Sequence, residues 1–178
     1  MSLTWLLCSY RLPRSPSRLR LAVWRRLRGL RAVMLHDGLW TLPADPKTRE
    51  DFEWLAEEVM ERGGTVLLWE AKSLGRKQDQ LLIDQFRVEA DERYAGLAEG
   101  ADQLAKLTQK KRSAAKSWDQ VLTRLRALER AVRLERRRDY FKAPGRAGAE
   151  AAIKSGFDLV RARTGEPQQE RRRRVMGD

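Results

Sequence analysis

Apolar residues in the first part of the chain follow two different spacings. Residues 3–12 are mostly apolar or aromatic and end before Pro13, which predicts a strand. From residue 17 to residue 31, apolar side chains recur every three or four positions, which predicts an amphipathic helix that Ser17 can cap. The chain is therefore expected to begin with a strand followed by a helix.

A hairpin and a second helix are predicted next. Residues 32–35 and 39–42 are short apolar runs on either side of Asp37-Gly38, a pair that favours a tight turn. Helical spacing then covers residues 48–62 and stops at Gly63-Gly64. The inner face of this helix is expected to hold Phe52, Leu55, Ala56, Val59 and Met60.

Residues 65–69 predict a fourth, apolar strand. The resulting order of strands and helices is that of an α+β, ferredoxin-like fold, with a four-stranded antiparallel sheet and two helices on one face. We assign residues 1–75 to this ferredoxin-like lobe. It holds five of the six tryptophans, most of which we expect to be core or interface anchors: Trp5, Trp24, Trp40, Trp54 and Trp69.

The pattern changes after residue 75. Apolar residues step by three and four as far as residue 104, and a second helical stripe runs from Trp118 to Val132. We assign residues 76–143 to a long antiparallel helical hairpin. Residues 144–165 are predicted to form a short helix, and residues 166–178 a basic, disordered tail.

Charge is segregated along the chain, whose formal net charge is +12. Residues 1–36 contain eight arginines and no acidic residue, whereas residues 37–103 contain 16 acidic and 8 basic residues. Residues 104–146 are basic again, with 14 basic and 4 acidic residues. Such blocks favour a phosphate-bearing partner. The alternative is that the basic blocks pair with the acidic middle inside one fold, because charge runs are commonly solvated faces.

Residues suited to catalysis or cofactor binding are scarce. Cys8 is the only cysteine and His36 the only histidine, so neither an intramolecular disulfide nor a zinc site is expected. The sequence has no glycine-rich nucleotide motif and no apolar stretch of the about 20 residues that span a membrane. We therefore expect a cytoplasmic protein that has no cofactor, is not an enzyme and does not enter a membrane.

The first predicted helix carries a face of arginines. Arg18, Arg25 and Arg28 point away from its apolar face, and Arg26 lies on the flank. Guanidinium groups arranged in this way can contact DNA phosphates and displace condensed counterions. The alternative is a solubilising surface. We favour DNA binding because no acidic residue balances these arginines locally.

A second row of arginines lies in the basic block further along. It consists of Arg126, Arg130, Arg133 and Arg137, spaced by four, three and four residues. Like charges at this spacing repel each other, so a helix that carries them often has an anionic partner. The competing interpretation is that acidic residues of the preceding antiparallel helix neutralise the row.

The loop that joins the first strand to the first helix mixes hydroxyl groups with arginines. Arg14, Ser15, Ser17 and Arg18 lie where free backbone N–H groups and the positive end of the helix dipole attract anions. Together they predict a site for a tetrahedral oxyanion such as sulfate, phosphate or chromate. A plain capped turn is the alternative.

The stretch from Ser9 to Pro43, SYRLPRSPSRLRLAVWRRLRGLRAVMLHDGLWTLP, resembles the amino-terminal domain of the chromate-resistance regulator ChrB. The segment around Glu53-Trp54-Leu55 and the long helix with Phe86 and Tyr94 fit the same layout, so the resemblance covers roughly residues 3–140. This domain is distantly similar to the core of phenylacetate-type repressors of the PaaX kind. Full-length members usually carry a second, carboxy-terminal domain, so we expect chromate sensing by this chain to be incomplete.

The resemblance implies a transcriptional regulator that binds promoter DNA and responds to chromate. A two-fold homodimer through an open sheet edge or an apolar helical stripe would match a palindromic operator. Two alternatives stay open: an RNA-binding or structural dimerisation module, and a metal-dependent nuclease. Small CRISPR-associated nucleases place a metal-binding Asp at the end of the first strand, where this chain has Ser9-Tyr10-Arg11, which disfavours the last.

Overall fold

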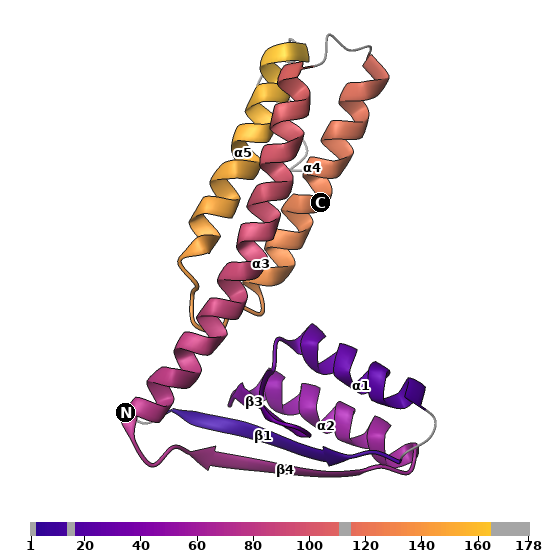
Figure 1. Cartoon of the computed structure of the whole chain (residues 1–178), viewed down its shortest axis with the longest axis vertical. Coiled ribbons are helices and arrows are strands. Elements are labelled where there is room, and N and C mark those ends of the chain that lie inside the picture. Colours follow the sequence, from indigo (N-terminus) through magenta and orange to yellow (C-terminus); the bar gives the residue numbers. More distant parts are fainter. Residues whose placement is uncertain (1–2, 14–16, 111–114, 165–178) are drawn as a thin grey trace. The chain divides into compact units, whose positions relative to one another are not determined.

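The computed structural model describes residues 3–13, 17–110 and 115–164. In chain order its elements are β1 (Thr4–Arg11), α1 (Ser17–Leu30), β2 (Val33–His36), β3 (Leu39–Pro43), α2 (Pro46–Glu61), β4 (Thr65–Lys72), α3 (Arg76–Lys110), α4 (Ala115–Arg136) and α5 (Gly145–Thr164) (Figure 1). The chain divides into two compact units between Arg87 and Val88, inside α3. The ferredoxin-like lobe assigned to residues 1–75 thus gains the first turns of α3.

The first unit is built on a four-stranded antiparallel sheet with the order β2-β3-β1-β4. β1 is central: it pairs with β3 from Trp5↔Pro43 to Ser9↔Leu39, and with β4 from Thr4↔Lys72 to Arg11↔Thr65. α1 and α2 cover one face of the sheet (Figure 1). This topology confirms the predicted α+β, ferredoxin-like arrangement.

Local sequence determines how β3 and α2 begin. Gly38 adopts φ +76, and a Cβ there would lie 2.9 Å from the Tyr10 carbonyl oxygen, so the hairpin turn requires glycine. α2 begins at Pro46, earlier than the predicted residue 48, because Asp45 and Thr48 form a reciprocal capping box. Proline in the first turn needs no N–H partner there.

Two of the five tryptophans of the first unit lie in its core. Trp5 and Trp40 are buried, but Trp24, Trp54 and Trp69 are 46%, 59% and 48% exposed. Of the tryptophans predicted to be core or interface anchors, Trp5 and Trp40 are therefore core residues, and an interface role for the three exposed ones stays a prediction. Met60 was misplaced on the inner face of α2, since its side chain is 52% exposed.

Asp79 in the first turn of α3 forms hydrogen bonds that connect this helix to β1. Its carboxylate accepts hydrogen bonds from Trp5 Nε1 at 2.8 Å, from the Leu3 backbone N–H at 3.3 Å and from the Ser73 hydroxyl. The Ser73 and Trp5 bonds, in that order, hold the pKa of Asp79 below its usual value. The Trp5 ring also stacks on Phe86, with ring centroids 5.9 Å apart.

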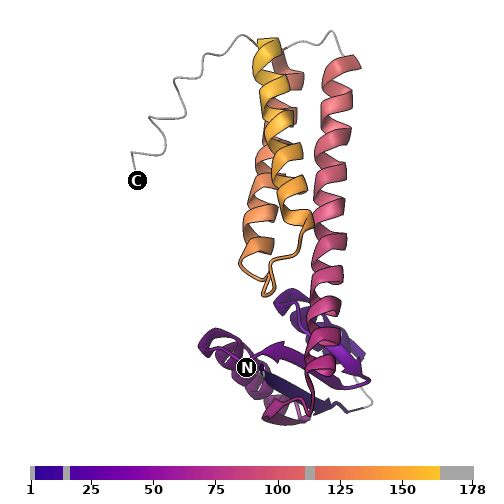
Figure 2. The ribbon, with the colours of Figure 1, turned by 90° about the vertical axis from the view of Figure 1, so that its left-hand side faces the viewer.

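The second unit consists of three helices side by side: the part of α3 from Val88 onward, α4 and α5 (Figure 2). The predicted helical hairpin forms, but the helix predicted to be short has 20 residues and joins the core through Ala149, Ile153 and Val160. α5 approaches α4 closely at Gly156, where a Cβ would lie 2.7 Å from Leu125 Cδ2. The small residue therefore allows this close packing.

Two further predictions concern the chain as a whole. No helix within the described ranges is long and apolar enough to cross a membrane. The tail predicted for residues 166–178 lies outside the described residues.

Candidate nucleic-acid interface

α1 separates an apolar face from a basic one. Its buried residues are Leu19, Val23, Leu27 and Leu30, which lie three or four residues apart and pack inward. Its arginines are all exposed: Arg18, Arg20, Arg25, Arg26 and Arg28. The structure thus places all four arginines proposed on this helix at the surface and adds Arg20 to them. α1 itself contains no acidic residue.

The basic face of α1 has little internal neutralisation. Within the described parts of the chain, Arg18, Arg25 and Arg26 form no ion pair with an acidic side chain. At the end of the helix, Arg31 Nη1 donates to the Arg28 carbonyl oxygen at 3.0 Å and helps to satisfy the helix end. The guanidinium groups of Arg18, Arg25 and Arg26 are therefore available to an external anion.

A groove borders this face on the side of the β2–β3 hairpin. Its volume is about 760 Å³, and it is lined by Tyr10, Arg11, Leu12, Arg20, Leu21, Trp24, Met34, Asp37, Gly38 and Trp40. Leu21, Trp24 and Met34 are each nearly half exposed. The groove thus joins apolar and aromatic surface to Arg20 of α1 and to Arg11 of β1. Sequence reasoning treated Trp24 as an anchor and missed this groove.

The second predicted arginine row lies on and just beyond α4. Arg126, Arg130 and Arg133 are exposed along the helix, and Arg137 is exposed in the turn after its last residue. Acidic residues of α3 do not neutralise the row within the described residues. In the ion pair that joins α3 to α4, the cation comes from α3 and the carboxylate from α4. Arg93 Nε lies 2.6 Å from Oε1 of the buried Glu135.

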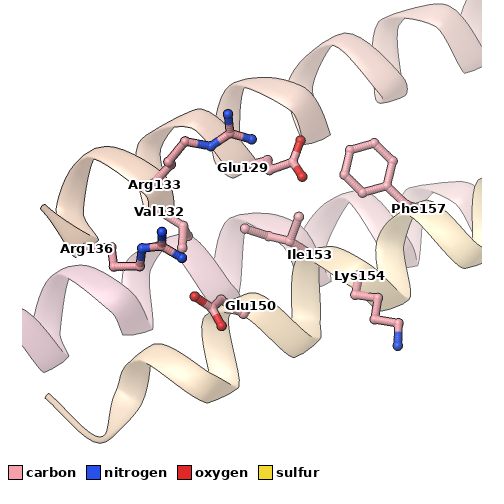
Figure 3. A pocket seen from close by; sticks show the side chains of 8 residues that line it. All are labelled: Glu129, Val132, Arg133, Arg136, Glu150, Ile153, Lys154 and Phe157. Atoms are coloured by element: carbon pink, nitrogen blue, oxygen red, sulfur yellow. The ribbon is translucent and has the colours of Figure 1, made fainter. Parts of the chain in front are cut away.

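α4 and α5 enclose a cavity of about 280 Å³ with mixed charge (Figure 3). Val132, Ile153 and Phe157 supply its apolar part. Its charged residues are Glu129, Arg133 and Arg136 from α4, and Glu150 and Lys154 from α5. Arg136 was not among the predicted site residues. The two carboxylates next to three cations make this a poorer anion site than the α1 face.

The predicted oxyanion loop is only partly described. Arg14 and Ser15 lie outside the described residues, as does the side chain of Ser17, which is the first residue of α1. Arg18 is exposed in the first turn of α1, which has no acidic side chain. Among the described residues, no three His, Cys, Asp or Glu side chains are grouped so that they could hold a metal ion.

Comparison with known proteins gives one match. Residues 20–161 match the model of a family described as "Protein ChrB, N-terminal". The match begins inside α1 and ends inside α5, so it covers parts of both compact units but not β1. No curated protein and no solved structure matches the chain.

Proposed function

Because the chain belongs to the ChrB N-terminal family, which is associated with the regulation of chromate resistance, we propose that it is a DNA-binding transcriptional regulator. The observation that carries this proposal is the basic face of α1. Five arginines are exposed on a helix of 14 residues without a single acidic residue. A helix surface of this kind attracts a polyanion rather than a protein surface of mixed charge.

The length of the α1 face suits a nucleic-acid backbone. From Arg18 to Arg28 the helix rises about 15 Å. Duplex DNA carries one phosphate charge per about 1.7 Å of its axis, so several phosphates lie within reach of such a face. Each arginine can form charge-assisted hydrogen bonds to phosphate oxygens, and each contact releases condensed counterions. Arg126, Arg130, Arg133 and Arg137 would add a second, weaker set of phosphate contacts.

The proposed regulator binds rather than catalyses. The end of β1 presents Ser9, Tyr10 and Arg11, so the carboxylate that a metal-dependent nuclease of this fold would need there is missing from the sequence. Cys8 is buried, and burial raises the pKa of its thiol to about 12, which keeps it protonated and unreactive.

A tetrahedral oxyanion, chromate above all, is the proposed effector, bound by Arg14, Ser15, Ser17 and Arg18 at the start of α1. The described part of this region supports the proposal through the exposed Arg18 and the absence of acid in the first helical turn. Because Arg18 also belongs to the proposed DNA-binding face, the oxyanion would compete directly with DNA phosphate. Release of DNA would then need no long-range conformational change.

The groove next to α1 favours a second candidate function, the binding of single-stranded nucleic acid such as RNA. Trp24 is 46% exposed and lies in the groove with Arg20. Unstacked bases bind to aromatic faces flanked by cationic side chains. A duplex keeps its bases stacked and cannot use Trp24 in this way, so the two functions are separable by experiment.

The test compares three ligands of equal length: duplex DNA from upstream of the gene, a scrambled duplex and single-stranded RNA. We expect the upstream duplex to bind most tightly, with affinity that falls as salt rises and as chromate is added in place of chloride at constant ionic strength. Tighter binding of RNA would support the second candidate instead. Equal binding to both duplexes would contradict a regulator that recognises an operator.

A further inference from the structure

The outer edge of β4 is the most unusual exposed surface of the first unit. β4 is the last strand of the sheet, and in the described part of the chain it pairs with β1 alone. Its eight residues match β1 in one continuous register from Thr65 to Lys72. The side of β4 that faces away from β1 therefore presents a long, regular row of backbone N–H and C=O groups.

The opposite edge of the same sheet is protected. β2 has four residues, and its pairing with β3 shifts register between Met34 and His36. A short or irregular edge is a common way to prevent one sheet from adding to another. β4 has neither protection: it contains no proline, and its only charged residues are Glu70 and Lys72 at one end. β4 therefore lacks the features that prevent a further strand from pairing with a sheet edge.

Large apolar side chains are exposed in the middle of β4. Leu67, Leu68 and Trp69 are 59%, 36% and 48% exposed. Leu67 and Trp69 lie on one face of the sheet and Leu68 on the other, because side chains alternate along a strand. The face of Leu68 is that of α2, since Glu70 on the same face forms an ion pair of 2.9 Å with Arg49. Apolar surface is thus exposed on both faces at this edge.

We propose that β4 pairs in antiparallel fashion with β4 of a second copy of this chain, about a two-fold axis at Leu68. Residues that face each other across such a pair lie on the same face of the joined sheet. With the axis at Leu68, Leu67 lies opposite Trp69 of the second copy, and Trp69 opposite its Leu67. Leu68 lies opposite itself. This register buries all three exposed apolar residues against one another.

Neighbouring registers are less favourable. An axis at Leu67 would place Trp69 opposite the polar Thr65 instead of Leu67. An axis at Glu70 would place two carboxylates face to face, and an axis at Trp69 would place Leu68 opposite Glu70. The symmetry of the apolar run about Leu68 also identifies the partner. A two-fold interface needs a surface that is complementary to itself, whereas a different protein would impose no such symmetry. The pairing does not depend on DNA binding and is tested without nucleic acid.

The first experiment is sedimentation velocity of the full chain over a range of concentrations. We expect a dimer in the wild-type protein and a monomer throughout the range for Leu68→Lys, because two ammonium groups would face each other at the axis. Trp54→Lys is the matched control: it charges an exposed aromatic residue of α2 that lies off the β4 edge, and it should stay dimeric. Circular dichroism confirms that both variants are folded.

A cysteine pair tests the register. Opposite side chains at the axis have Cβ atoms about 5 Å apart, so Leu68→Cys should form a disulfide-linked dimer under mild oxidation. Val66→Cys should not, because its position faces Glu70 of the second copy. Cys8 of β1 lies directly opposite Leu68 in the sheet, so both cysteine variants also carry Cys8→Ala, which prevents an intramolecular disulfide. A monomeric wild-type protein, or a dimeric Leu68→Lys variant, would overturn the interface. Failure to crosslink at residue 68, or crosslinking at residue 66 instead, would overturn the register.

Discussion

Rows of exposed arginines occur on both α1 and α4, but their surroundings differ. α1 contains no acidic residue, whereas α4 contains Asp119, Glu129 and the buried Glu135, and the cavity beside it includes Glu150 from α5. The α4 arginines repeat at intervals of three and four residues, whereas those of α1 follow no single interval. The comparison therefore teaches that exposed arginines identify a basic face, while local acidic residues decide how strongly that face attracts phosphate.

The largest effect is expected from the combined substitution of Arg18, Arg25 and Arg28 by Ala. Each lost phosphate contact should cost about 1 kcal/mol, and three contacts correspond to a fall in DNA affinity on the order of 100-fold. The fold should be retained because all three side chains are exposed. Fluorescence anisotropy with labelled upstream DNA measures the affinity, and thermal unfolding monitors the fold.

The same change in net charge on α4 serves as the matched control. Replacing Arg126, Arg130 and Arg133 by Ala also removes three positive charges, but we expect a loss of affinity of less than about tenfold, since nearby carboxylates weaken the attraction for phosphate. A loss equal to that of the α1 variant would remove the distinction between the two helices. It would indicate instead that only total charge matters.

A smaller effect concerns the stability of the unit that presents α1. The pKa of Asp79 is lowered in the folded chain, chiefly by the Ser73 hydroxyl and then by Trp5, so its carboxylate stabilises the fold above its unfolded pKa of about 3.9. This contribution is lost as the pH falls through the lower folded pKa. Asp79→Asn should therefore be less stable than wild type at pH 7, with a difference that shrinks below about pH 4.

Tryptophan fluorescence during urea unfolding is a suitable probe of this effect. Five of the six tryptophans lie in the first unit, so the signal reports mainly on that unit. A stability difference between wild type and Asp79→Asn that is the same at pH 7 and pH 3 would contradict the role assigned to the carboxylate.

The spacing of apolar residues was sufficient to predict the order of strands and helices in the first unit. The order of its strands and helices follows from apolar spacing and from Asp37-Gly38, and the sheet order confirms it. The exposure of Trp24 was also within reach of the sequence, because it lies off the Leu19, Val23 and Leu27 face in helical projection. It was missed because tryptophan was judged by residue type rather than by position.

Other features depended on contacts distant in sequence. The bond between Arg93 and Glu135 joins residues 42 positions apart, so spacing within one helix could not show which acidic residues were already paired. The bounds predicted for the last helix, residues 144–165, are close to those of α5, but its packing against Leu125 at Gly156 could not be predicted from spacing. Tertiary contacts therefore decided both points.

The most direct test of the α1 interface is the dependence of DNA affinity on salt. The logarithm of the binding constant falls linearly with the logarithm of salt concentration, with a slope of about −0.9 per neutralised phosphate. We predict that the variant lacking Arg18, Arg25 and Arg28 has a slope shallower than wild type by about 2.7, while the α4 variant, whose phosphate contacts are weaker, shows a smaller change. A slope that is unchanged in the α1 variant would contradict the claim that this helix binds the DNA backbone.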